Sequence, residues 1–173
     1  MAIDVDLRDE TADLVERRLD LAIRITSNPD PALIGKPIGN CQSILVASPD
    51  YCKTSPKIQK PADLAQHQCL GYKHFDYHTW YLQSGTEHAS VNIQCRYTAN
   101  ETTNLLYATL HGAGVALLPT YLTDRHISSG ELIHVLPKWK PKDLQVYALN
   151  SSRKNLRPAV RQLIDHLECY FQT

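Results

Sequence analysis

Short apolar runs of the kind that form β-strands alternate with helix-like segments along the chain, and this alternation limits the fold to the mixed α/β class. Residues 3–7 alternate apolar and charged side chains, which is typical of a strand with one covered face. Asp9 or Thr11 can cap a short helix after them, and the apolar run 21–23 follows. A connection of about a dozen residues allows parallel pairing. We therefore expect the chain to open inside a βαβ unit.

The rest of the chain continues the same alternation. Further strands are expected at five apolar segments: residues 43–47, 91–94, 115–118, 132–136 and 145–149. A short helix is expected around residues 62–65. A longer one begins at the N-cap Asn100 and ends at Gly112, and another begins at Thr120.

The C-terminal helix has the clearest pattern. Its apolar side chains recur at steps of three and four residues, as on one face of an amphipathic helix: Leu156, Val160, Leu163, Ile164, Leu167 and Phe171. The helix begins after Asn155, and Pro158 is tolerated in its first turn. We expect its apolar face to pack on the sheet formed by the first strands, with Leu163 in the core.

Composition excludes several classes of function. The 173 residues include 18 Lys and Arg against 18 Asp and Glu, so the formal net charge is +0, and this chain alone is not expected to bind DNA. Its uncharged stretches are far shorter than the roughly 18 to 20 residues of a membrane span. The N-terminus lacks the pattern of a signal peptide. Five cysteines without a CxxC pair suit a reducing compartment. We expect a cytoplasmic protein with free thiols.

Five segments together resemble the effector-binding domain of LysR-type transcriptional regulators. They occur in the order seen in that family, and the resemblance covers residues 3–171. The segments are DLVERRLDLAIRI (13–25), PALIGKPIGNCQSILVASPDY (31–51), PADLAQHQCLGY (61–72), ANETTNLLYATLHGAGVALLP (99–119) and SGELIHVLP (129–137). The most specific part is the combination of DLAIRI, ASPxY and Gly-x-Gly-x-Ala-x-Leu-Pro.

The resemblance implies a periplasmic-binding-protein-like fold of type 2, in which two α/β lobes joined by two crossover strands hold a small effector in a cleft. Lobe one would comprise residues 1–46 and 149–173, and lobe two residues 47–148. The crossings would be residues 44–48 and 145–150. On this resemblance we expect this chain to lack the winged helix-turn-helix and the first βα unit of the family, so lobe one would be incomplete. The resemblance also implies a homodimer, with transcriptional control exerted by the parent protein.

Candidate ligand-binding residues lie at the ends of predicted elements. A helix start offers free backbone N–H groups for an anion. Polar residues after the DLAIRI strand occupy the usual ligand position of α/β sheets. Aromatic and imidazole groups at 72–80 can form a flat wall. The candidates are Thr26, Ser27, Tyr72, His74, Tyr77, Asn100, Glu101, Thr102 and Thr103. The expected effector is a small organic anion or aromatic acid.

Each candidate also has a purely structural interpretation. The helix start can be an ordinary cap at which Glu101 disfavours an anion, and the aromatic stretch can simply pack Phe75 and Trp80 into the core. His74 and His78 would share a helical face for a metal only if the stretch were helical, which nothing in the sequence indicates. We expect no metal, cofactor or enzymatic activity, since nucleophile and dinucleotide motifs are lacking. A free-standing cytosolic ligand-binding or interaction protein of the same fold is the alternative.

Overall fold

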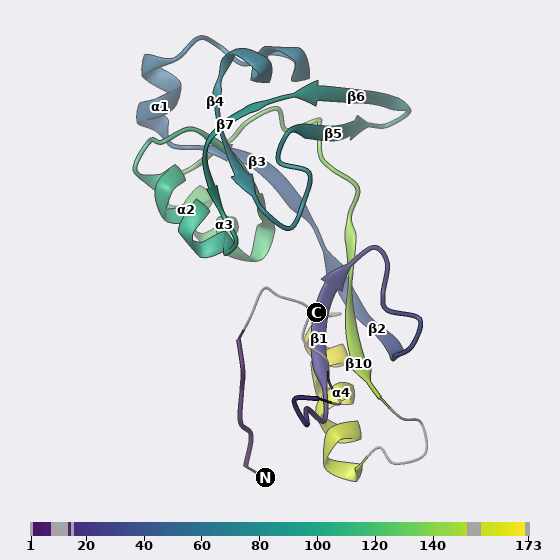
Figure 1. Ribbon diagram of the computed structural model, residues 1–173. Helices are drawn as coiled ribbons and strands as arrows, with labels where there is room; N and C mark the ends of the chain where they lie inside the picture. The colour runs from purple at the N-terminus through teal and green to yellow at the C-terminus, as the bar shows by residue number, and fades with distance from the viewer. Residues whose placement is uncertain (1, 8–13, 15, 152–156, 172–173) are drawn as a thin grey trace. The chain divides into compact units, whose positions relative to one another are not determined.

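The computed structural model describes residues 2–7, 14, 16–151 and 157–171 (Figure 1). The chain forms two compact units, each of which is described by itself. Unit 1 comprises Met1–Cys41 and Asp143–Thr173, and unit 2 comprises Gln42–Lys142.

Unit 1 is built on a three-stranded antiparallel sheet. The strands are β1 (Ala22–Thr26), β2 (Ile34–Cys41) and β10 (Leu144–Asn150), and their order is β1-β10-β2. The helix α4 (Pro158–Phe171) contacts β2.

The apolar stripe of α4 packs on this sheet, as predicted. Val160, Ile164 and Leu167 join a core that contains Ile38 and Val146. Ile164 is only 4% exposed. Leu163, the residue expected in the core, is half-buried and lies outside this cluster. The apolar periodicity of the sequence therefore predicted the helix correctly. It placed the centre of the buried face at Leu163, one residue before the observed centre at Ile164.

The predicted βαβ opening of the chain is wrong. Residues 3–7 form no strand, and Ile3, Val5 and Leu7 are between 58% and 89% exposed. The short helix after them was placed largely on residues 8–13 and 15, which lie outside the described residues. β1 pairs with β10, and the pairing is antiparallel. The apolar side chains of residues 3–7 are thus not covered, although alternation favours a covered face. Alternation also carries no information about which strand lies alongside or in which direction.

Unit 2 is built on a mixed five-stranded sheet in the order β7-β4-β8-β3-β9. β4 is parallel to both of its neighbours, whereas β3 is antiparallel to β8 and β9. A separate hairpin, β5-β6, completes the strands. The bounds are β3 (Ser43–Ala47), β4 (Gln68–Tyr72), β5 (Thr79–Ser84), β6 (Glu87–Asn92), β7 (Gln94–Ala99), β8 (Val115–Pro119) and β9 (Ile133–His134). The strand predicted at 91–94 thus divides into the end of β6 and the start of β7.

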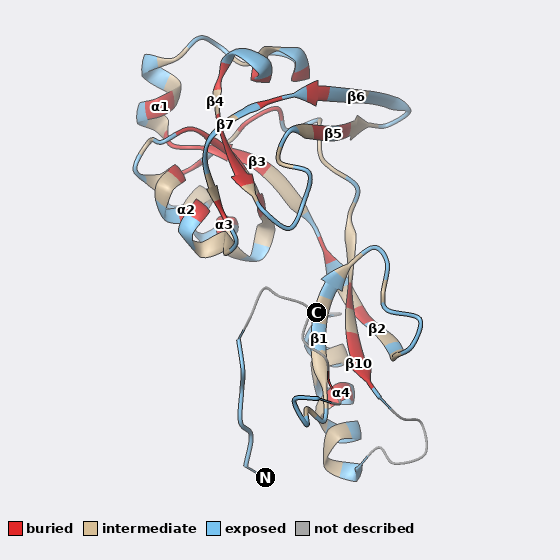
Figure 2. Cartoon of the chain, viewed as in Figure 1, coloured by how far each residue is buried: buried red, intermediate tan, exposed pale blue. Residues whose placement is uncertain are grey.

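The helices of unit 2 are short. They are α1 (Pro49–Thr54), a 3₁₀ helix η1 (Pro61–Gln66), α2 (Thr102–Leu110) and α3 (Thr120–Ser128). One core cluster contains Leu45, Leu64 and Trp80, and a second contains Val46, Leu70 and Leu105. Alternate residues of β3 thus enter different clusters, as expected for a strand buried on both faces. Figure 2 shows the concentration of buried residues on β3 and β4.

The two strands predicted to cross between lobes each belong to one unit. β3 pairs only within unit 2, and β10 pairs only within unit 1. The chain passes between the units at 41–42 and 142–143, slightly before the predicted lobe boundaries at 46–47 and 148–149. The apolar sequence of each strand indicates that the strand is buried. Which sheet the strand joins depends on the strands that pair with it, and these are distant in the sequence.

A glycine fixes the entry into β8. Gly114 has φ of 154°, and a Cβ there would collide with the backbone carbonyl of Gln68 at the start of β4. Only glycine combines this conformation with so close an approach of two backbones. The second glycine of the Gly-x-Gly-x-Ala-x-Leu-Pro segment is thus explained by the packing of β8 beside β4.

The described helices of both units lack the length and apolar character that a membrane-spanning helix requires.

Candidate functional site

Two loops of unit 2 leave the sheet side by side. β4 and β7 are parallel neighbours, with Tyr72 opposite Ala99 in the register. The backbone N–H of Lys73 donates to the carbonyl oxygen of Ala99 at 2.9 Å. Residues 72–78, called the aromatic loop below, therefore emerge beside the turn that leads into α2. Ligands of α/β proteins commonly bind at such carboxyl ends of parallel strands.

The aromatic loop has a defined internal structure. The ring of Tyr72 contacts the rings of His74 at 5.3 Å and Phe75 at 5.4 Å between centroids. The carboxylate of Asp76 accepts hydrogen bonds from the backbone N–H groups of His78 and Thr79, at 2.9 and 3.1 Å. His74 and Phe75 remain exposed. The loop thus presents aromatic faces on a backbone that its own aspartate holds in place.

Tyr77 differs from the other aromatic residues of the loop. It is half-buried, and its Cβ lies so close to Gly71 of β4 that a Cβ at Gly71 would be 2.7 Å away. Its ring stacks obliquely on that of His78, with centroids 4.4 Å apart. The backbone carbonyl of Tyr77 accepts a hydrogen bond from the Sγ of Cys95 at 3.1 Å. Tyr77 therefore anchors the loop to the sheet.

The start of α2 differs from the prediction. The N-cap is Glu101 rather than Asn100, and helix α2 begins at Thr102. The Glu101 carboxylate accepts hydrogen bonds from the backbone N–H groups of Thr103 at 3.0 Å and Asn104 at 3.1 Å. The chain thus supplies its own anion to the amides that were expected to bind one.

Electrostatics keep this cap negatively charged. Partial burial raises the pKa of Glu101, but hydrogen bonds from Thr103 and Asn104 outweigh that effect and leave the pKa below its ordinary value. Glu101 is therefore ionised at neutral pH. A second anion at the same amides would have to displace the Glu101 carboxylate, or it would be repelled by that charge.

Thr26 and Ser27 lie in unit 1, at the end of β1. The Thr26 hydroxyl accepts a hydrogen bond from the N–H of Asn28 at 3.1 Å and donates to its carbonyl oxygen at 3.3 Å. Ser27 is exposed. The expectation of a parallel-strand edge here is wrong, because β1 pairs antiparallel with β10. The structure therefore brings together the candidates of unit 2, whereas Thr26 and Ser27 form a separate local turn.

Burial disfavours the reactive thiolate form of four of the five cysteines. In the described part of the chain, no three His, Cys, Asp or Glu side chains gather as a metal site. No disulfide joins any of the five cysteines, all of which lie in the described part of the chain. Burial raises the pKa values of Cys41, Cys52 and Cys95, and raises that of Cys69 to about 12. Thiols held in the protonated form are poor nucleophiles.

Sequence reasoning missed the role of Lys73. Its backbone N–H joins the two loops, and its exposed side chain adds a positive charge to the aromatic loop. The available signal was its position directly after residues 68–72, which form β4 and contain the apolar run 69–71. That run was not predicted as a strand, so the loop had no assigned position in a sheet.

Comparison with known proteins identifies the family. The model of the LysR substrate binding domain matches residues 1–172. The chain therefore belongs to the LysR substrate-binding domain family, and the resemblance seen in the sequence is confirmed.

Individual relatives agree with this assignment. The transcriptional regulator PtxR of Pseudomonas aeruginosa is 34% identical over 160 residues, which are 92% of this chain and 51% of PtxR. The structure of full-length AphB, a virulence activator of Vibrio cholerae, has a TM-score of 0.82 at 26% identity and covers 97% of this chain and 57% of AphB. The regulatory domain of CrgA from Neisseria meningitidis has a TM-score of 0.80 at 26% identity, covering 93% of this chain and 81% of that domain.

These likenesses confirm the predicted fold class, the two-lobed α/β fold of periplasmic-binding-protein type 2 that LysR regulatory domains share. The chain spans about half the length of the curated relatives it matches. Those relatives are described as transcriptional regulators rather than enzymes.

Proposed function

We propose that this chain is the effector-sensing part of a transcriptional regulator and that the aromatic loop and the start of α2 together contact the effector. The observation that carries the proposal is the hydrogen bond from Lys73 to Ala99, which joins the two loops at the carboxyl ends of β4 and β7. Regulation of transcription, and DNA binding through another domain, are proposed for the whole protein. The regulator relatives favour this function over a free-standing binding protein.

The side chains of the loop favour a flat ligand with an acidic group. Exposed His74 and Phe75 beside Tyr72 offer aromatic faces on which a ring can stack. Lys73 supplies a positive charge in the same loop, whereas ionised Glu101 repels an anion at the first amides of α2. We therefore propose an aromatic acid whose ring contacts the loop and whose carboxylate lies nearer to Lys73 than to Glu101.

The hydroxyl groups at the start of α2 have a distinct role in this proposal. Thr102 is half-buried in the first turn, directly after the cap. Its hydroxyl can donate to a ring substituent or accept from one without displacing Glu101. Thr103 already donates its hydroxyl to Glu101, so Thr102 is the better test residue.

Thr26 and Ser27 are proposed as further effector contacts, and they are tested separately because they belong to unit 1. We also propose that the domain forms a homodimer in the cytoplasm. Exposed Tyr107 of α2 and Tyr121 of α3 supply apolar surface for such an association. Sedimentation equilibrium across a range of protein concentrations measures the oligomeric state, and a monomer at all concentrations would contradict it.

A ligand screen tests the proposed site. Aromatic acids and their uncharged amides are screened by thermal shift, and those that stabilise the protein are titrated by calorimetry. We expect His74→Ala and Thr102→Ala each to weaken the confirmed acid by about tenfold, because each removes one direct contact. His88→Ala, which removes an exposed histidine from β6, is the matched control and should bind like the wild type.

Binding by the unit 2 variants and by the unit 1 variants tests the two parts of the proposed site separately. If a confirmed ligand binds His74→Ala and Thr102→Ala as tightly as the wild type, the site is assigned wrongly. Thr26→Ala and Ser27→Ala are then informative, since weakened binding in these variants alone would move the site to unit 1.

A further inference from the structure

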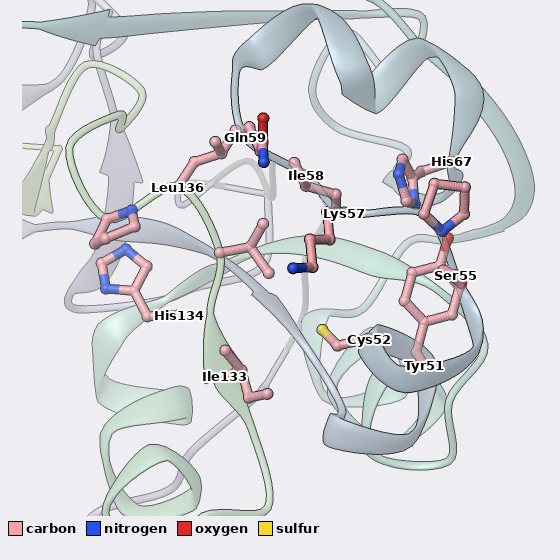
Figure 3. Close-up of a pocket in the computed structure, with 13 residues that line it drawn as sticks. Tyr51, Cys52, Ser55, Lys57, Ile58, Gln59, His67, Ile133, His134 and Leu136 are labelled. Carbon is pink, nitrogen blue, oxygen red and sulfur yellow. The ribbon is translucent and has the colours of Figure 1, made fainter.

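A pocket lies in unit 2, lined by none of the residues of the proposed effector site (Figure 3). Its volume is about 330 Å³, and it is lined by α1 and the loop after it, by His67, and by residues 133–137. None of the residues proposed to bind the effector lines it. β9 forms the edge of the sheet opposite to β7. The pocket is therefore a separate feature, and its size falls within the usual range for small-molecule sites, which begins at roughly 300 Å³.

The walls of the pocket are fixed by the fold. The Tyr51 hydroxyl lies 3.1 Å from Nδ1 of His67 and accepts a hydrogen bond from the N–H of Gln68 at 3.0 Å, which ties α1 to the segment before β4. The N–H of Val135 donates to the carbonyl oxygen of Leu45 at 2.8 Å, which ties the other wall to β3. Such a pocket is formed before any ligand arrives, so little ordering opposes binding.

The lining is apolar with a single full positive charge. Ile58, Val135 and Leu136 provide aliphatic surface. In Figure 3 the amino group of Lys57 points into the space enclosed by the lining side chains. The 13 lining residues include no Asp and no Glu. Desolvation lowers the pKa values of His67 and His134, so Lys57 is the group that sets the charge of the pocket at neutral pH.

One of the residues that line this pocket, His134, has a buried ring nitrogen that can hydrogen-bond to a ligand. Nε2 of His134 is buried and has no hydrogen-bond partner in the described part of the chain. A buried polar atom without a partner is unfavourable. A reorientation of the His134 ring that accompanies ligand binding would relieve this and place a neutral donor or acceptor beside the ligand.

We propose that this pocket binds a small aliphatic carboxylate, with the hydrocarbon body between Ile58 and residues 133–136 and the carboxylate paired with Lys57. The aliphatic walls set the preference for a hydrocarbon body, and the one lysine of a lining without Asp or Glu sets the preference for an anion. This site is independent of the aromatic loop, and so it is independent of the proposed effector.

Octanoate is the probe for this site. The intact chain is titrated with octanoate by calorimetry, and chemical-shift changes are followed by NMR on isotope-labelled protein. We expect saturable binding with one octanoate per chain and shifts centred on the methyl groups of Ile58 and Val135. Lys57→Gln should weaken octanoate by about tenfold or more, because it removes the charged hydrogen-bond donor.

Matched controls separate charge pairing from general effects. Lys53→Gln removes a neighbouring lysine that pairs with Asp50 and does not line the pocket, so it should bind octanoate like the wild type. The uncharged analogue octanamide should bind more weakly than octanoate and should not distinguish Lys57→Gln from the wild type. His74→Ala should leave octanoate binding unchanged.

The proposal would be overturned by no saturable octanoate binding, by equal binding by Lys57→Gln and the wild type, or by shifts centred on the aromatic loop instead of Ile58 and Val135. A loss of octanoate binding in His74→Ala would also overturn it, by placing octanoate in the effector site. Absent octanoate binding, or equal binding by Lys57→Gln and the wild type, leaves the screen of aromatic acids unaffected, so failure of this proposal is distinguishable from failure of the other.

Discussion

Replacement of Ile164 by alanine tests how unit 1 is held together. Ile164 is the buried residue at the centre of the α4 stripe, and it packs with Ile38, Cys41 and Val146 on the sheet. This core cluster of unit 1 has five buried members, fewer than either cluster of unit 2. A cavity at Ile164 therefore removes a large share of the apolar contacts that hold α4 on its sheet.

The expected magnitude follows from the atoms removed. Alanine lacks three of the side-chain carbons of isoleucine, and burial of each is worth about 0.8 kcal/mol, so transfer alone accounts for about 2.4 kcal/mol. The cavity left behind adds to this value, and isoleucine-to-alanine changes in cores cost about 2 to 5 kcal/mol. We expect Ile164→Ala to lower the free energy of unfolding of unit 1 by about 3 kcal/mol.

The assay can follow the two units separately. Both tryptophans, Trp80 and Trp139, belong to unit 2, so their fluorescence reports on that unit during urea unfolding. Hydrogen exchange at α4 amides reports on unit 1. In Ile164→Ala, we expect faster exchange in α4 and a nearly unchanged fluorescence transition.

Leu163→Ala is the matched control, because it alters the adjacent, half-buried residue outside the cluster. Its loss of stability should be well below that of Ile164→Ala. Equal losses for the two variants, or a loss below about 0.5 kcal/mol for Ile164→Ala, would refute the packing argument, since surface substitutions typically stay within that range.

Three further predictions concern unit 2 and the whole chain. Glu101→Gln should lower stability by up to about 1 kcal/mol at neutral pH by weakening the cap. Because the folded pKa of Glu101 lies below 4.5, the wild type should lose this contribution as the pH falls through that lower pKa, and acid unfolding monitored by circular dichroism should show a smaller loss in the variant. Tyr51→Phe should cost about 1 to 3 kcal/mol, since it leaves His67 and the N–H of Gln68 without their shared partner, and a urea midpoint equal to that of the wild type would contradict this. The purified chain, with a formal net charge of +0, should show no sequence-selective band in a gel-shift titration with operator DNA, and such a band would disprove it.

The sequence predicted elements well where their apolar pattern was uninterrupted. β3 has the predicted bounds, and α4 has the predicted face within one residue. β2 was not predicted, because Gly35, Pro37 and Gly39 interrupt its apolar pattern. The strand β2 tolerates glycine and proline because it lies at the edge of its sheet. Its register with β10 also shifts beside Pro37, as at a β-bulge.

The candidate site was predicted in part. The chemical character of the aromatic loop can be read from residues 72–80, but its position depends on the pairing of β4 with β7, which are separated by the β5-β6 hairpin. The role of Glu101 as N-cap was not predicted, because Asn100 is the better cap by residue type. The pocket beside Lys57 has no sequence signal, since its two walls come from segments about 75 residues apart that meet through β3 and β9.

The pairing of β4 with β7 connects the core of unit 2 to the proposed effector site. Gly71 leaves no room for a Cβ, because Tyr77 and the Sγ of Cys95 occupy the space above it. The same absence of a side chain lets the aromatic loop return over β4, where the Tyr77 carbonyl and the Lys73 N–H make the anchoring hydrogen bonds. The position of the loop is thus fixed by a glycine, backbone groups, a thiol and the Asp76 carboxylate. Exposed side chains such as His74 make none of these anchoring hydrogen bonds. Ligand selectivity can therefore change through these exposed side chains without any change in the fold that supports them.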